Sequence, residues 1–160
     1  MKSWGSCVLE DRATIPDRYG AQMQGPRPRL LYLVTAHEVQ EVRSSLAKGR
    51  LPPDFDAKLA RLGDGDLIHR YVEQYSRLFF MLLLAASEGS FTAATPAQRE
   101  RLLRVLAYVR KDDDAIPDYR RDGFIDDQQE VRAAATELGP LLHAFKVWRL
   151  RHQVPGLWRG

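Results

Sequence analysis

The sequence predicts an all-α protein, a single-domain bundle of about five helices with an irregular N-terminal arm over residues 1–34. Three observations predict it. Apolar residues recur at the three- and four-residue spacing of amphipathic helices. Helix-capping signals stand in front of these segments. The run 78–86 is apolar on every side, as in a helix at the centre of a fold. With 160 residues in all, residues 35–160 can form one domain that buries its own core.

The N-terminal arm lacks any sustained periodicity. Gly25-Pro26-Arg27-Pro28-Arg29 is typical of an extended, polyproline-like segment. We expect either a loose tail or a strap that orders on a partner. The apolar run 30–34 that follows predicts a short strand or a buried lead into the first helix.

Caps and apolar stripes predict the first three helices. Thr35, followed by Glu38 three residues later, forms a capping box and predicts a helix from the next residue. Its buried stripe would be Val39, Val42 and Leu46. A short helix is predicted over 54–62. Asp66 caps the third, which should extend to about Ser87 and form the core of the bundle.

Two further segments have helical patterns. Thr95-Pro96-Ala97-Gln98 combines a capping box with proline at the first helical position. In this helix Leu102, Leu106 and Val109 should face inward, and Arg101 and Arg104 should face water. The last helix should begin near Asp126 and Asp127, with an inward stripe of Val131, Ala135, Leu138, Leu142 and Phe145. Gly139-Pro140 predicts a kink or a two-helix break, because Pro140 cannot donate a backbone hydrogen bond.

Composition narrows the class of protein. The net charge of +3 is small, so nucleic acid is not an expected partner. The single cysteine, Cys7, excludes an internal disulfide and a multi-cysteine zinc site. There is no secretory signal pattern and no apolar stretch near the ~20 residues that span a bilayer. We therefore expect a soluble, cytoplasmic protein.

The segment 112–127 is the one stretch whose residues indicate more than burial or solubility, with seven aspartates. If Gly123 is the sixth position of a calcium loop, Asp118 stands first, but Arg120 stands third and Gln129 twelfth, where ligands belong. These faults argue against a normal EF-hand. A looser divalent-metal site remains a hypothesis, with ligands among Asp114, Asp118, Asp122, Asp126 and Asp127. The alternative is that these aspartates cap turns and helix starts and pair with arginines. No other cofactor is predicted.

Catalytic patterns are weak. His37, His69, His143 and His152 lie on separate segments or too far apart for a paired metal-ligand spacing. No serine lies in a nucleophile-elbow context. The sequence therefore predicts no catalytic residue, and the enzyme hypothesis that stays open is a metal-dependent activity at the aspartate cluster.

The C-terminal tail interleaves aromatic and basic residues. Its candidate contact residues are Trp148, Arg149, Arg151, Trp158 and Arg159. Such a mixture suits a membrane surface or a macromolecular partner. The alternative is a terminal helix that docks its aromatic side on the core and keeps the arginines outside.

One family resemblance rests on the aspartate segment. Tyr108 is followed by Asp114-Ala115-Ile116-Pro117-Asp118, then by Gly123, Phe124-Ile125 and Asp126-Asp127. This order resembles the signature of the YkvA-like family of small, mostly bacterial proteins of unknown function. The spacer 119–122 is charged here, where the family's is apolar and contains proline. The resemblance implies a helical protein with the signature at a helix–loop–helix junction, and it implies no particular activity.

We accordingly interpret the segment first as a rigid junction between two core helices, with Tyr108, Ile116, Pro117 and Gly123 as its structural residues. Ile116-Pro117 and Phe124-Ile125 should point inward, and Asp118 and Asp127 should bond to backbone N–H groups or arginines. The leading functional hypothesis is a non-enzymatic accessory or regulatory protein that binds another protein. The alternatives are a peripheral membrane protein held by the C-terminal tail and the metal-dependent activity.

Overall fold

The computed structural model describes residues 33–112, 118 and 123–152, and within these ranges all regular structure is helical. The helices are α1 (Ala36–Ala47), α2 (Pro53–Gly63), α3 (Leu67–Ser87), α4 (Pro96–Arg110), α5 (Ile125–Glu137) and α6 (Gly139–His152). The prediction of an all-α bundle is confirmed. Among the described helices, none combines the length and the apolar character that crossing a membrane requires.

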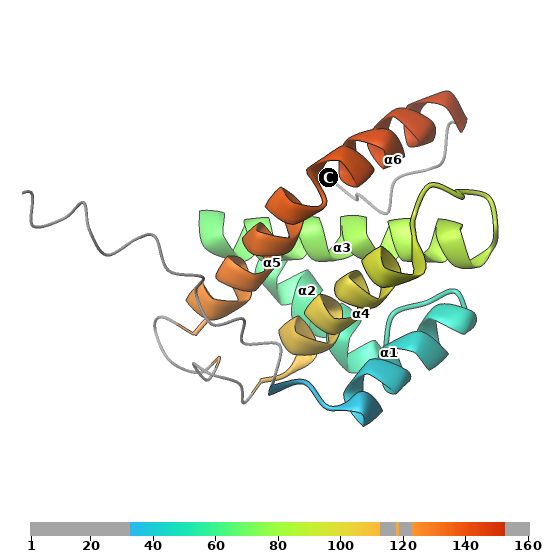
Figure 1. Cartoon of the computed structure of the whole chain (residues 1–160). Coiled ribbons are helices and arrows are strands. Elements are labelled where there is room, and N and C mark those ends of the chain that lie inside the picture. Colours follow the sequence, from blue (N-terminus) through green and yellow to red (C-terminus); the bar gives the residue numbers. More distant parts are fainter. Residues whose placement is uncertain (1–32, 113–117, 119–122, 153–160) are drawn as a thin grey trace, which may run out of the picture.

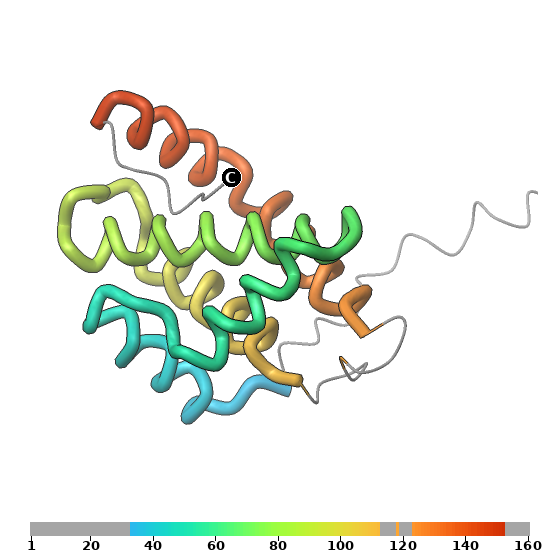
Figure 2. Tube along the Cα trace, turned by 180° about the vertical axis from the view of Figure 1, so that it is seen from behind, coloured from blue at the N-terminus to red at the C-terminus, as the bar shows by residue number. Residues whose placement is uncertain are grey.

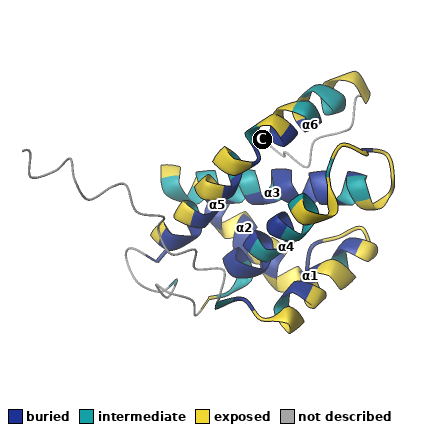
Figure 3. Ribbon diagram, viewed as in Figure 1, coloured by how far each residue is buried: buried dark blue, intermediate teal, exposed yellow. Residues whose placement is uncertain are grey.

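The long helix α3 forms the centre of the bundle. It packs against α1, α2, α4 and α5, and in Figures 1 and 2 it runs between α6 on one side and α1 on the other. Its residues from Leu78 to Leu83 are all buried, as the dark colour of α3 in Figure 3 indicates. Burying each such large apolar side chain stabilises the fold by about 1.5–3 kcal/mol. The prediction of a core helix here is confirmed.

The predicted helix starts are confirmed at three caps. Thr35 and Glu38 form a reciprocal capping box at α1, and Thr95 and Gln98 form another at α4. Asp66 accepts a hydrogen bond of 3.0 Å from the backbone N–H of His69 at α3. Each cap satisfies backbone N–H groups that have no partner within the helix.

The break at Gly139 is also confirmed. Helix α5 ends at Glu137, α6 begins at Gly139, and this division supplies the sixth helix of the described chain. Helix α6 packs on α5 and lies at the edge of the bundle, above α3 in both views. Its inner side buries Leu141, Leu142 and Phe145.

The expected orientation of Arg101 is wrong. The side chain is only 9% exposed, and its Nε donates to Oε2 of Glu137 at 3.1 Å. Helix α4 packs against α1, α3 and α5, so it has little surface left for polar residues. Arg104 is half-buried as well. The inward residues of the same helix, Leu102, Leu106 and Val109, are buried as expected.

Candidate functional site

A buried lysine lies at the C-terminal end of α4. Lys58 belongs to α2, and its side chain is 3% exposed. Its Nζ donates to the backbone carbonyl oxygens of Val109, at 2.5 Å, and Lys111, at 2.6 Å. The last carbonyls of a helix lack partners in the helix and carry a partial negative charge. The ammonium of Lys58 therefore caps α4 from a neighbouring helix.

Three carboxylates surround the same ammonium. Oδ2 of Asp118 lies 2.5 Å from Nζ, Oδ1 of Asp112 lies 3.6 Å away and Oδ2 of Asp127 lies 3.9 Å away. The two carbonyl oxygens accept hydrogen bonds from the ammonium, and Asp118 forms the shortest ion pair with it. We call Lys58, these three aspartates and the two carbonyl oxygens the Lys58 cluster. It joins α2, the end of α4 and the start of α5.

The neighbouring carboxylates at the start of α5 are buried too. Asp126, Asp127 and Glu130 all lie in the interior, and the hydroxyl of the buried Tyr108 donates to Oδ2 of Asp126 at 2.7 Å. Asp126 and Asp127 stand in the first turn of α5, where the helix dipole favours negative charge. Tyr108 thus ties α4 to α5 at the side of the Lys58 cluster.

Burial changes the acidity of one member of the cluster. Loss of water around the Asp118 carboxyl raises its pKa to about 6, and the nearby Asp112 adds to this effect, although the Lys58 ammonium acts in the opposite direction. Near neutral pH Asp118 is mostly ionised and pairs with Lys58. Slightly acidic conditions protonate it.

A cavity of about 460 Å³ opens beside the cluster. Its lining residues are Lys58, Arg61, Leu62, His69, Asp112, Asp118 and Phe124. The rings of His69 and Phe124 meet edge to face, with centroids 4.8 Å apart, and the Phe124 centroid lies 5.5 Å from Nζ of Lys58. The cavity therefore combines an aromatic wall with charges of both signs.

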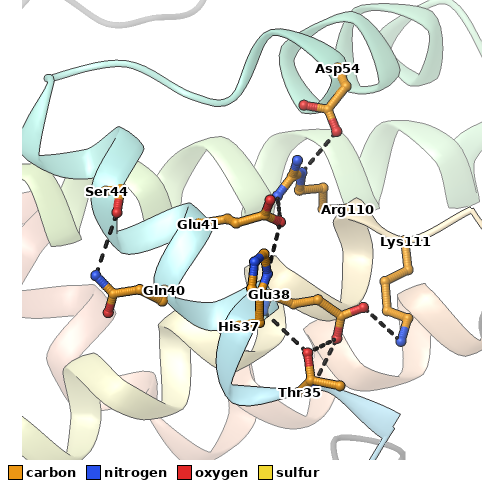
Figure 4. A network of polar contacts seen from close by, with 9 residues as sticks. All are labelled: Thr35, His37, Glu38, Gln40, Glu41, Ser44, Asp54, Arg110 and Lys111. Carbon is orange, nitrogen blue, oxygen red and sulfur yellow. Dashed lines mark hydrogen bonds and ion pairs between the residues drawn. The ribbon is translucent and has the colours of Figure 1, made fainter.

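A second set of ion pairs fixes the end of α4 from the other side (Figure 4). The guanidinium of Arg110 contacts Asp54 at 2.8 Å and Glu41 at 2.7 Å. Nζ of Lys111 contacts Glu38 at 3.0 Å and donates to the carbonyl oxygen of Leu33 at 2.8 Å. The last residue of α4 and its C-cap, Arg110 and Lys111, are thereby attached to α1, α2 and Leu33.

The predicted metal ligands are only partly brought together. Asp118 and Asp127 face Lys58, and Asp126 faces Tyr108. Asp114 and Asp122 lie outside the described residues, so the metal hypothesis stays a prediction. Within the described ranges, no group of three or more His, Cys, Asp or Glu side chains has an arrangement suited to a metal ion. A cation of the chain itself already lies among these carboxylates.

The structure agrees with only some of the predictions made for the junction residues. Gly123 is buried beside α5, while Ile116 and Pro117 lie outside the described residues. Phe124 is half-buried, but the inward orientation expected of Ile125 is wrong, since it is 37% exposed. Among the described residues, the carboxylate of Asp118 pairs with Lys58, whereas an arginine or a backbone N–H was expected.

Sequence reasoning missed Lys58 as the centre of the site. A signal was available, because Lys58 lies within the buried stripe of α2 formed by Phe55, Leu59 and Leu62. A lysine in an apolar stripe either extends its amine to the surface or has a buried counter-charge. Lys58 has buried counter-charges, among them the carboxylate of Asp118.

Some candidate contact residues of the C-terminal tail pack against the fold, and others lie on the surface. The half-buried Trp148 stacks on Phe145, with centroids 5.6 Å apart, and on His152, at 4.7 Å. The guanidinium of Arg149 lies 6.0 Å from the centre of the Phe145 ring. Arg151 is exposed, as is its neighbour Leu150. Trp158 and Arg159 lie outside the described residues.

Comparisons with known proteins found no matching family model, no similar curated protein and no similar solved structure. The resemblance to the YkvA-like family is therefore untested and stays a prediction.

Proposed function

We propose that this protein is a non-enzymatic accessory or regulatory protein that binds another protein through the outer face of α6. The observation that carries the proposal is the exposure of Leu150. This leucine is 81% exposed on a helix whose inner side is already packed. An exposed leucine flanked by basic side chains, on a helix without acidic residues, supplies an apolar centre with a charged rim, which is the arrangement of a protein–protein interface.

The charge of α6 indicates what kind of partner would fit. Its sequence, Gly139–His152, contains Lys146, Arg149 and Arg151 and no acidic residue. Lys146 and Arg151 are exposed on either side of Leu150 in the sequence, and the outer end of α6 is coloured as exposed in Figure 3. The matching partner is an acidic protein surface with an apolar centre, because complementary charges steer association and fix its register.

The state of the Lys58 cluster supports a role without catalysis. A lysine acts as a nucleophile or a base when its amine is free and uncharged. The ammonium of Lys58 is instead engaged by two carbonyls and one carboxylate at 2.5–2.6 Å. These contacts favour a structural role for Lys58.

The proposal is tested by capturing partners from native extract of the source cells with wild-type protein, Leu150→Glu and Leu67→Glu. Leu67 is the matched control, because it is 83% exposed but lies on α3. We expect a stoichiometric partner with wild type and Leu67→Glu, and its loss with Leu150→Glu. Equal retention by Leu150→Glu, or capture of no partner by the wild type, would overturn the proposal.

A membrane surface is the second candidate, since the same basic helix with an exposed leucine suits anionic lipid. Flotation with anionic vesicles separates the two candidates. Wild-type flotation that Leu150→Glu abolishes would favour the membrane. The stacking of Trp148 against Phe145 and His152 favours the protein partner, because this tryptophan is engaged within the fold.

A further inference from the structure

We propose that Lys58 acts as a built-in cation at the junction between α4 and α5. Its ammonium occupies the position that a bound divalent cation would have in an acidic loop, and it contacts the same kinds of oxygen atom. The role is conformational and independent of the surface on α6. In this role, a single side chain of α2 fixes the end of α4 and the start of α5.

The ligands of Lys58 are those of a hard cation. Calcium in proteins is held by backbone carbonyls and carboxylates, at 2.3–2.6 Å. The Nζ atom has two carbonyl oxygens and one carboxylate oxygen at 2.5–2.6 Å. Two more carboxylate oxygens, of Asp112 and Asp127, follow at 3.6 and 3.9 Å. These oxygens come from separate segments, as the ligands of a cross-linking ion do.

The charge balance explains why a cation is needed at this position. Three carboxylates lie within 3.9 Å of one ammonium; the side chains of Asp118 and Asp127 are shielded from water there, whereas that of Asp112 is 77% exposed. Burial among these groups raises the pKa of Asp118 to about 6 even with the ammonium in place. Removing the ammonium would leave the shielded carboxylates of Asp118 and Asp127 and two helix-end carbonyls beside a vacated space. Such an arrangement must collapse, take up protons or take up another cation.

The lysine has an advantage over an ion because packing holds it in position. Phe55, Leu59 and Leu62 bury the same face of α2. The side chain reaches its oxygens from inside the bundle and remains only 3% exposed. A chelator can remove a metal ion, but it cannot remove this group.

The first test replaces the ammonium and then offers a divalent cation. Lys58→Ala vacates the space, Lys58→Met fills it without charge, and Lys48→Ala removes an exposed lysine at the end of α1 as a control. Melting temperatures are compared in chelator and with about 10 mM calcium or magnesium, a concentration chosen to exceed the Kd of a weak site.

We expect wild type and Lys48→Ala to respond to neither ion. Lys58→Ala should melt at lower temperature in chelator and recover by ~3 °C or more with calcium. Lys58→Met should also be destabilised but gain little from calcium, since its side chain occupies the space. A Lys58→Ala variant that melts like wild type in chelator, or that does not respond to either ion, would overturn the proposal.

A second measurement uses the wild-type protein, so that it does not depend on the folding of a variant. Amine acetylation under native conditions, followed by mass spectrometry, compares Lys58 with the exposed Lys48. We expect acetylation of Lys58 to be slower by about 10-fold or more, because its amine is buried and fully bonded. Equal rates at the two lysines would contradict the built-in cation.

Discussion

The hydrogen bond between Tyr108 and Asp126 offers a sharp test of the junction. Replacing Tyr108 by phenylalanine removes a single oxygen atom and keeps the ring that packs in the core. The hydroxyl lies 2.7 Å from Oδ2 of Asp126, and both side chains are buried. A buried hydrogen bond to a charged acceptor contributes about 1.5–3 kcal/mol. We expect Tyr108→Phe to lower the free energy of unfolding by that amount.

The assay is urea denaturation followed by tryptophan fluorescence and by circular dichroism. Agreement of the two signals checks two-state behaviour, and an unchanged m-value shows that the surface exposed on unfolding is the same. Tyr75→Phe is the control, because Tyr75 is half-buried and its ring contacts Tyr71 and Phe79. It should change the stability by less than about 1 kcal/mol.

A double-mutant cycle with Asp126→Ala isolates the pair, because alanine has no acceptor for the Tyr108 hydroxyl. If the hydroxyl acts through Asp126, Tyr108→Phe should cost at least ~1 kcal/mol less in the Asp126→Ala background than in the wild type. An equal cost in the two backgrounds would refute the reasoning, as would a loss in the wild type below about 0.5 kcal/mol.

Three further predictions concern other contacts. Gly65→Ala should cost about 1–3 kcal/mol in urea denaturation, because its Cβ would lie 2.3 Å from Nδ1 and 2.6 Å from Cβ of His69. Gly63→Ala, whose Cβ would meet nothing closer than 3.8 Å, should be neutral or stabilising by up to ~1 kcal/mol, and equal losses at the two glycines would contradict the clash. Asp118 has a pKa of about 6 when folded against 3.8 in the unfolded chain, so its stabilising effect is complete below pH 3.8 and is lost as the pH rises through 6. Melts between these pH values should show wild type losing stability relative to Asp118→Asn as the pH rises, and a difference that does not vary with pH would argue against the raised pKa. Arg101→Met should change the free energy of unfolding by less than about 1 kcal/mol or raise it, because Nη1 and Nη2 of Arg101 are buried and have no hydrogen-bond partner among the described residues. A loss near 3 kcal/mol would mean that the guanidinium is better satisfied than its contacts indicate.

The sequence was most informative where the determining interaction is local. The capping box of Thr35 and Glu38 spans three residues, so the start of α1 could be read directly. The break at Gly139 follows from the chemistry of Pro140, and the buried run of α3 follows from its composition. In each case a few neighbouring residues decide the outcome.

The errors arise where distant segments decide the environment. Periodicity assigned Arg101 to a polar face, but that face is covered because α4 has helices on several sides. Ile125 was expected inside from its apolar character alone, and it is more than one-third exposed. Patterns along one helix give the direction of a side chain, but they do not say which neighbour occupies that direction.

The candidate site shows the same limit. The importance of the aspartates was visible in the sequence, but their counter-charge comes from Lys58, which is 51 residues away from Val109. The sequence suggested arginines or a metal ion as the balancing charge. Only packing between α2 and α4 brings the lysine to this position.

The contacts at the end of α4 also set an order of events during synthesis of the chain. Glu41 and Arg110 are 69 residues apart, and Leu33 and Lys111 are 78 apart. Helices α1 and α2 emerge from the ribosome first, yet the partners of Glu38, Asp54 and Lys58 belong to residues 109–111 and beyond. Contacts of such long separation form late and slow folding. The N-terminal half should therefore acquire its final packing only after α4 has been translated, and nascent chains that stop before residue 109 should remain sensitive to protease.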